Sequence, residues 1–241
     1  MKPYPRTRIK ICGLTREQDV DSAVEAGADA VGFIQYDKSP RHVSIERAAQ
    51  LAARLPAFVT PVLLFVNEAP ARVLACLDRL PNALAQFHGD ETAQQCLEST
   101  RGGVHAYLRA ARIPLDGRPF DLVRFAQEHA AARAVLLDAH VEGYGGAGKA
   151  FEWSRLPANV NAHLVLSGGL TPANVGDGIA QVRPRCKSLA VDVSSGVEAS
   201  ATKGATQPGV KDPEKIHQFV AAVRAADALL AKSSHVPLPA T

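Results

Sequence analysis

Residues 8–34 read RIKICGLTREQDVDSAVEAGADAVGFI, and this stretch decides the fold. It opens with a short β-branched run at 8–12 and continues with a stretch at 16–26 whose apolar residues recur at helical spacing. It closes with a second apolar run at 30–34. Strand, helix and strand in this order are typical of a βαβ unit, in which the two strands lie parallel.

The same alternation recurs along the rest of the chain. The expected strands are residues 8–12, 30–34, 60–65, 83–87, 104–108, 134–137, 163–166 and 188–191. The expected helices are residues 16–26, 45–55, 71–80, 91–99, 120–131, a weak one at 151–155, 172–182 and 213–231. Eight such pairs in 241 residues predict an α/β fold, a single (β/α)8 TIM barrel forming one domain over residues 1–241, with a frayed tail at 232–241.

Three residues are expected to mark helix ends. Thr15, with Gln18 three residues later, predicts the N-cap of the first helix. Thr171 followed by Pro172 predicts the start of the seventh. Gly27 suits the C-terminal stop of the first helix.

The composition limits the class of protein. The chain is 46% hydrophobic and 21% charged, which excludes disorder. Its 27 Lys and Arg residues exceed its 24 Asp and Glu residues by only 3 and are spread along the chain, so nucleic acid is not an expected partner. No run of about 18 apolar residues occurs, so we expect no membrane contact and a cytoplasmic location.

The four cysteines form no C-x-x-C pair, so the sequence suggests neither a zinc site nor a disulfide framework. Three of them, Cys76, Cys96 and Cys186, are expected to be structural.

Two small-residue turns follow the last two expected strands, Ser167-Gly168-Gly169 and Ser194-Ser195-Gly196. In a (β/α)8 barrel the loops at the carboxyl ends of the strands carry the active site, and a phosphate site commonly follows strands seven and eight. Backbone N–H groups of such turns, with a short helix beginning near Ser194, can approach an anion closely. Either pair of glycines alone could simply turn the chain, but the two together favour phosphate binding.

An acid and a base are expected on opposite sides of the barrel mouth. Cys12 ends the first expected strand and could be a general base or nucleophile, although a buried structural cysteine is the commoner case. Asp138 closes an apolar run and could supply a proton, or could merely cap a turn. A thiolate paired with a carboxylic acid suits an isomerisation.

Two further side chains follow expected strands. Arg41 carries a planar fork that suits a carboxylate, although an exposed, salt-bridged arginine is the usual case. His88 could contact a substrate or belong to a turn.

Nine motifs along the chain match one known family. They are Lys10-Ile-Cys-Gly-Leu-Thr15, Gly32-Phe33 through Ser39-Pro-Arg41, Phe65-Val-Asn67, Gln86-Phe-His-Gly89, Leu136-Leu-Asp-Ala139, Gly145-Gly-Ala-Gly148 with Phe151 and Trp153, Leu166-Ser-Gly-Gly-Leu170 with Asn174, Asp192-Val-Ser-Ser-Gly-Val-Glu198 and Gly209-Val-Lys-Asp212. On these motifs the chain resembles phosphoribosylanthranilate isomerase of tryptophan biosynthesis from Ile9 to about Val223. The motif at residues 10–15 and the DVSSGVE motif at residues 192–198 are together highly specific for this family.

The resemblance implies an Amadori rearrangement of N-(5-phosphoribosyl)anthranilate with no cofactor and no metal. Asp138 matches the general acid and Cys12 the general base. Arg41 matches the arginine that holds the anthranilate carboxylate, Asp192 a residue near the substrate, and His88 lies in a matching motif. The phosphate turns match at four residues, Gly168, Gly169, Ser195 and Gly196.

The chain departs from the family pattern at Gln35-Tyr36, Phe87 and Ala147, and the segment 199–208 is longer than usual and could be a lid or a passive insertion. Two alternatives stay open. One is a histidine-pathway aminoaldose isomerase. Cys12 argues against this alternative, because that family has an Asp at the end of its first strand. The other is an inactive barrel that binds a phosphorylated metabolite. We expect a monomer or a homodimer.

Overall fold

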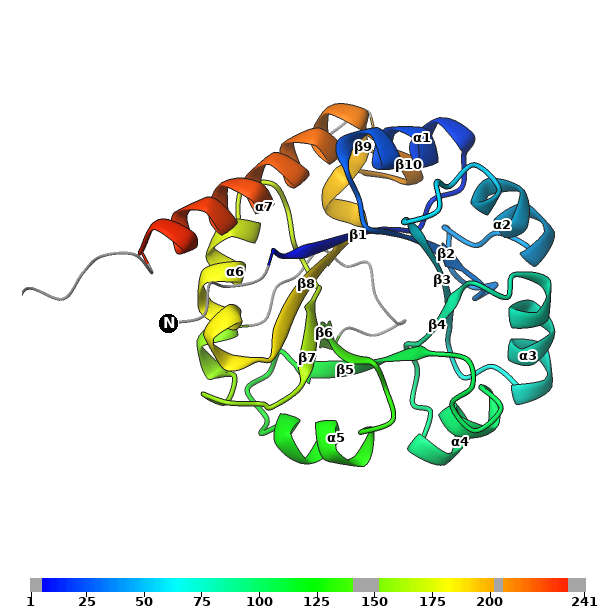
Figure 1. The fold of residues 1–241 in the computed structure, drawn as a ribbon, viewed down its shortest axis with the longest axis horizontal. Coiled ribbons are helices and arrows are strands. Elements are labelled where there is room, and N and C mark those ends of the chain that lie inside the picture. The colour runs from blue at the N-terminus through cyan, green and yellow to red at the C-terminus, as the bar shows by residue number, and fades with distance from the viewer. Residues whose placement is uncertain (1–5, 141–151, 202–205, 234–241) are drawn as a thin grey trace, which may run out of the picture.

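The computed structural model describes residues 6–140, 152–201 and 206–233, and its centre is a closed barrel of eight parallel strands in chain order. Figure 1 looks through this barrel, with the helices around its outside. The barrel strands are β1 (Arg8–Cys12), β2 (Ala30–Ile34), β3 (Thr60–Phe65), β4 (Leu84–Phe87), β5 (Tyr107–Pro114), β6 (Ala134–His140), β7 (His163–Leu166) and β8 (Ser188–Val193). The predicted TIM barrel is confirmed.

The helices are α1 (Glu17–Ala26), α2 (Ile45–Ala52), α3 (Pro70–Arg79), α4 (Ala93–Glu98), α5 (Leu122–Glu128), α6 (Val175–Val182) and α7 (Pro213–Ser233). Single 3-10 turns are η1 (Trp153–Arg155), η2 (Arg183–Arg185) and η3 (Ser195–Val197). A hairpin that the sequence did not predict, β9 (Glu198–Ser200) with β10 (Thr206–Lys211), follows β8.

Alternate side chains of β1 face opposite sides of the sheet. Ile9 and Ile11 are buried in the large core cluster between the strands and the helices. Cys12 instead packs with Ile34 and Leu64 in a separate cluster. Because side chains alternate along a strand, Lys10 shares the interior face with Cys12.

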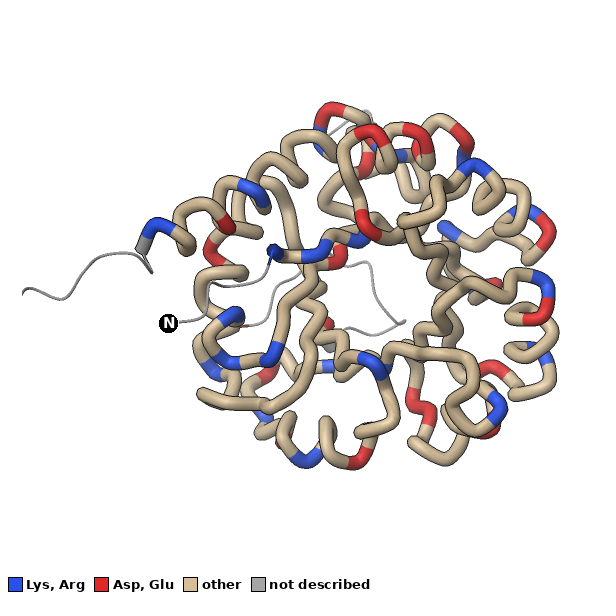
Figure 2. The backbone as a smooth tube through the Cα atoms, in the orientation of Figure 1, with Lys and Arg blue, Asp and Glu red and all other residues tan. Residues whose placement is uncertain are grey.

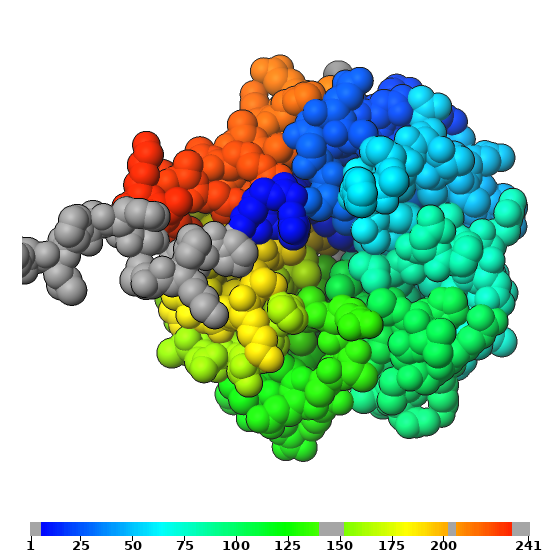
Figure 3. All heavy atoms as spheres, viewed as in Figure 1, coloured from blue at the N-terminus to red at the C-terminus, as the bar shows by residue number. Residues whose placement is uncertain are grey.

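The barrel closes between its first and last strands. Lys10 of β1 lies opposite Asp192 of β8 in the register. The segment just before β1 is also fixed to α7, because Asp227 accepts hydrogen bonds from the Thr7 N–H at 2.8 Å and from Arg183 Nη2 at 2.7 Å. Figure 3 shows the first described residues, in blue, beside the orange-to-red α7.

Charges of both signs are mixed around the ring of helices (Figure 2), so the outer surface carries no single-sign belt. Among the helices that the structure describes, none combines the length and the apolar content that crossing a membrane requires.

Several element boundaries differ from the prediction. The fifth strand begins at Tyr107 rather than at residue 104, because Arg101, Gly102 and Gly103 have positive φ and form a turn there. The weak sixth helix is the single turn η1, preceded by residues outside the described part. Helix α7 continues to Ser233, and the rest of the predicted tail lies outside the described residues.

Two predicted N-caps are wrong and the C-cap is confirmed. Helix α1 is capped by Arg16 without a side-chain bond, because the Thr15 hydroxyl donates to the Gly209 carbonyl at 2.6 Å. Helix α6 begins at Val175 instead of residue 172, with Asn174 as its cap. Gly27 ends α1 with φ of +93°, as predicted.

Candidate active site

Cys12 lies at the end of β1 with only 3% of its surface exposed. Gly32, opposite it on β2, makes this position possible, since a Cβ at residue 32 would lie 2.6 Å from Cys12 Sγ and 3.1 Å from Lys10 Nζ. The thiol and the ammonium therefore meet at one point inside the barrel.

Lys10 and Asp192 form a buried ion pair beside this thiol, with 2.9 Å between Nζ and Oδ1. Burial raises the pKa of Cys12 and the charge of Asp192 adds to the rise, while the ammonium of Lys10 opposes it. Burial also disfavours the charged form of Lys10, but Asp192 and Cys12 together raise its pKa above the ordinary value. Lys10 is thus the cation that stabilises a thiolate at Cys12.

Asp138 lies within β6, which runs beyond the predicted end of that strand. One carboxylate oxygen, Oδ2, is 2.8 Å from His88 Nε2, and the other accepts the Ala139 N–H at 2.9 Å. His88 Nδ1 is 3.0 Å from Gln86 Nε2. With the Gln86 amide in this orientation it donates to Nδ1, so Nε2 carries the proton that His88 donates to Asp138.

Arg41 is buried rather than exposed. Its Nε and Nη2 donate to Oε1 and Oε2 of Glu198 at 2.6 and 2.8 Å. The stem of the side chain runs over Gly13, where a Cβ would lie 2.7 Å from Arg41 Cδ. The arginine thus has a fixed place at the mouth.

The two predicted phosphate turns touch. Gly168 and Gly169 have φ of +78° and +65°, a conformation that favours glycine. Gly196 lies in η3, where a Cβ would overlap with the Leu170 carbonyl oxygen. A Cβ at Gly168 would lie 2.8 Å from Asp138 Oδ1, so the first turn also lies against the expected acid.

The sequence did not point to Lys10, Gln86, Glu198 or Lys211 as individual site residues. Lys211 is 1% exposed and donates to the Ser194 carbonyl at 2.9 Å, which anchors the second turn. A lysine inside an apolar strand, two residues before Cys12, is a signal that could have found Lys10, because period-two spacing places both on one face. The predicted Gly-rich loop containing Ala147 lies outside the described residues.

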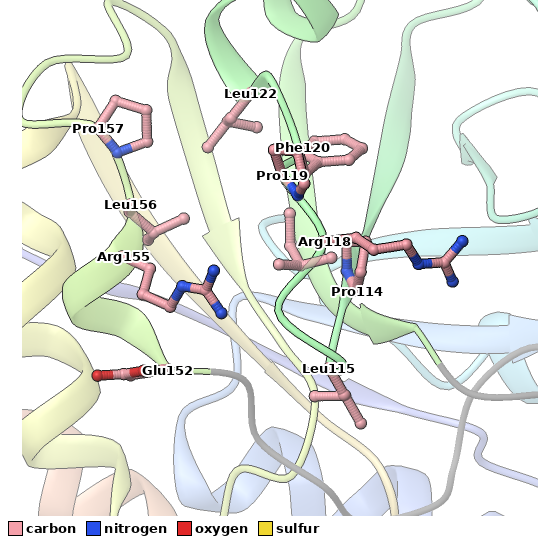
Figure 4. A pocket seen from close by; sticks show the side chains of 11 residues that line it. Pro114, Leu115, Arg118, Pro119, Phe120, Leu122, Glu152, Arg155, Leu156 and Pro157 are labelled. Carbon is pink, nitrogen blue, oxygen red and sulfur yellow. The ribbon is translucent and has the colours of Figure 1, made fainter.

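A cavity of about 500 Å³ lies on the flank of the barrel (Figure 4), between the segment after β5 and the residues around η1. Its polar lining includes Arg118, Glu152 and Arg155. Among the described residues that line it, none is a predicted site residue. Within the described residues, no three His, Cys, Asp or Glu side chains are grouped as a metal site.

Comparisons with known proteins agree on one family. The family model of N-(5'-phosphoribosyl)anthranilate (PRA) isomerase matches residues 9–222. An N-(5'-phosphoribosyl)anthranilate isomerase of Methylibium petroleiphilum is 57% identical over 95% of this chain and 99% of its own. One of Leptothrix cholodnii is 56% identical over 92% of this chain and 93% of its own.

Solved structures give the same family. The phosphoribosyl anthranilate isomerase of Thermotoga maritima has a TM-score of 0.77 and 38% identity, covering 91% of this chain and 99% of its own. A second structure of this kind, in complex with reduced 1-(o-carboxyphenylamino)-1-deoxyribulose 5-phosphate, has a TM-score of 0.74 and 34% identity with the same coverage.

Proposed function

This chain belongs to the N-(5'-phosphoribosyl)anthranilate isomerase family, and we propose that Cys12 and Asp138 are the base and the acid of its reaction. The protein is an intramolecular aldose–ketose isomerase of tryptophan biosynthesis. The observation that supports the assignment is the pair of buried contacts at the mouth, Cys12 beside the Lys10–Asp192 ion pair and Asp138 against His88.

In the first step Asp138 protonates the ring oxygen of the ribose. The bond between that oxygen and C1 breaks, and the lone pair of the anthranilate nitrogen forms the C=N bond of a protonated Schiff base. His88 donates to Oδ2 at 2.8 Å and the Ala139 N–H donates to Oδ1 at 2.9 Å, and the two contacts fix the orientation of this carboxyl group. The sequence predicted His88 as a substrate ligand, and in this mechanism its proposed role is to orient the acid Asp138 through their hydrogen bond.

In the second step the thiolate of Cys12 removes the proton from C2. The electrons of that C–H bond form the C1=C2 bond of an enolamine, and the nitrogen recovers its lone pair. The enolamine gains a proton at C1 and loses one from its C2 hydroxyl, which gives the ketone. Burial of Cys12 raises the pKa of its thiol, so its thiolate is a stronger base than an exposed one.

Four backbone positions, Gly168, Gly169, Ser195 and Gly196, are proposed to bind the phosphate. Arg41 is proposed to bind the anthranilate carboxylate. Asp192 is proposed to lie near the substrate, which its ion pair with Lys10 beside Cys12 supports. Neither a cofactor nor a metal enters these steps.

We propose a cytoplasmic enzyme with one domain over residues 1–241, monomeric or homodimeric. The Thermotoga maritima relative is described as dimeric. Sedimentation equilibrium of the purified chain distinguishes the two states.

The test follows the loss of phosphoribosylanthranilate fluorescence, with the labile substrate generated in place. Cys12→Ser and Asp138→Asn are expected to lower kcat by roughly 10²–10⁴-fold, because each removes one proton transfer. Matched controls are Cys186→Ser and Asp78→Asn, which lie away from the mouth. Wild-type protein without turnover would overturn the function, and two fully active variants would overturn the acid and base.

A further inference from the structure

Glu198 is fully buried and has four donors around its carboxylate. Arg41 Nε and Nη2 lie 2.6 and 2.8 Å from Oε1 and Oε2. Oε1 also accepts from the Gly209 N–H at 2.9 Å and from Lys211 Nζ at 3.3 Å. The site of this carboxylate is therefore built from the loop after β2 and from the hairpin after β8.

The contacts of Arg41 leave one edge of its guanidinium available. A guanidinium has five N–H groups, which form two edges that can each hold a carboxylate through two parallel hydrogen bonds. Glu198 occupies the Nε and Nη2 edge, and the Nη1 and Nη2 edge remains for a second carboxylate. Gly13 supports the stem of Arg41, so the direction of that second edge is fixed.

The charges of this cluster are unequal. Lys211 donates to the Ser194 carbonyl and hydroxyl and to Glu198, which uses the three donors of an ammonium. Burial disfavours ionisation of Glu198, but Arg41, Lys211 and Gly209 together hold the pKa of its carboxyl below the ordinary value. Burial lowers the pKa of Lys211, and the charge of Glu198 opposes this shift. Arg41 and a protonated Lys211 together face one anion, and a ligand carboxylate would balance the excess charge.

We propose that Glu198 is a positioning residue, which orients Arg41 toward the substrate carboxylate and connects it through Lys211 to the phosphate turn at Ser194. This inference rests on the proposed function, because it takes the substrate to be the carboxylated one. It assigns carboxylate selectivity to a residue whose carboxylate, among the described residues, is hydrogen-bonded by Arg41, Gly209 and Lys211.

The experiment compares two stable ligands by titration calorimetry. One is reduced 1-(o-carboxyphenylamino)-1-deoxyribulose 5-phosphate, and the other is the same compound without its carboxyl group. The ratio of their Kd values measures the preference for the carboxylate. Glu198→Gln presents an amide –NH2 to one N–H donor of Arg41, so we expect this preference to fall about tenfold. Binding of the decarboxylated ligand is expected to change less than about threefold.

Arg41→Lys serves as the reference, since it keeps the charge but lacks the fork, and it should lose the preference to a similar extent. Glu214→Gln, an exposed substitution on α7, is the matched control and should keep the wild-type ratio. If Glu198→Gln does not fold, Glu198→Asp keeps the charge but is one methylene too short to reach both nitrogens, and it should show a smaller fall in the same ratio.

An unchanged ratio of Kd values in the Glu198 variants would overturn the proposal. If both ligands bind equally more weakly, the ratio is also unchanged, and Glu198 then has a structural role only. Wild-type protein that binds both ligands equally well would also overturn it. Failure of the proposed function gives a different result. In that case the wild-type protein binds the ligands but does not isomerise the substrate.

Discussion

A buried lysine controls the chemistry available to the cysteine of this site. Lys10 lies between the Cys12 thiol and the Asp192 carboxylate, and all three are nearly inaccessible to water. In such surroundings the free thiol is favoured over the thiolate, and Lys10 is the nearest group that lowers the cost of ionisation. Burial is the largest influence on the pKa of Cys12, and the charge of Lys10 opposes it.

Replacement of Lys10 by Met should raise the pKa of Cys12 further. The variant removes the cation that favours the thiolate and leaves the Asp192 carboxylate, which disfavours it. Thiolate would then form only at higher pH, so the pH profile of Cys12 alkylation by iodoacetamide, followed by peptide mass spectrometry, should move to higher pH.

The exposed substitution Lys187→Met is its control and should leave the profile in place. A profile that does not move, or that moves to lower pH, would remove Lys10 from this role.

For single residues the sequence draws attention to polar side chains that follow apolar runs, and it does so for Cys12 and Asp138, although Asp138 lies within β6 and not at its end. It did not predict Glu198, because this residue follows the strand and its partners come from segments 157 and 13 positions away along the chain. Side chains whose role depends on such distant partners carry no local signal.

Among the elements, the α4 helix has the most complete N-terminal cap. The Thr92 hydroxyl accepts the Gln95 N–H at 3.2 Å, and Gln95 Oε1 accepts the Thr92 N–H at 2.8 Å. Both residues are exposed, so the cap can be altered without a change in packing.

Thr92→Ala should lower the free energy of unfolding by about 1 kcal/mol, since it leaves a helix N–H without its acceptor. Urea denaturation monitored by circular dichroism measures the change. Gln94→Ala on the same exposed face removes only its bond to Glu98 and should cost a few tenths of a kcal/mol. Equal effects of the two substitutions would show that the cap contributes nothing of its own.

Every barrel strand was predicted, but the predicted end of β5 at residue 108 is too early, because a charged residue follows the apolar run there. The β5 strand contains Arg109, which is 4% exposed and donates to the carbonyls of Phe87 and Gly89. Its guanidinium also lies over the Phe125 ring, 5.6 Å from the centroid. These contacts of Arg109 are made by residues distant in the sequence. The sequence alone therefore gives a polar pattern typical of a loop where the structure has a buried strand.

For the whole molecule, the two ends of the barrel sequence are held together by Asp227. This residue of α7 binds both the N–H and the hydroxyl of Thr7, as well as Arg183. Thr7 and Arg183 are both buried, so the contacts cannot be replaced by water without local opening.

Asp227→Ala should therefore destabilise the barrel by about 2–3 kcal/mol, because it leaves Arg183 buried without this counter-ion. The measurement is the urea midpoint, with Glu25→Ala, an exposed substitution on α1, as the control. Turnover at low temperature should be retained, since Asp227 is remote from Cys12 and Asp138 in the proposed mechanism. An unchanged midpoint would mean that the contacts of Asp227 contribute nothing to the stability of the barrel.

The missing side chain at Gly196 has a consequence for recombination between barrels. The space it leaves is filled by the Leu170 carbonyl, so the seventh and eighth loops interlock through backbone atoms. A donor loop from another barrel would bring its own backbone path, and the recipient's neighbouring loop would no longer fit against it. We therefore expect that the loops after β7 and β8 can be exchanged between barrels only when both are transferred together.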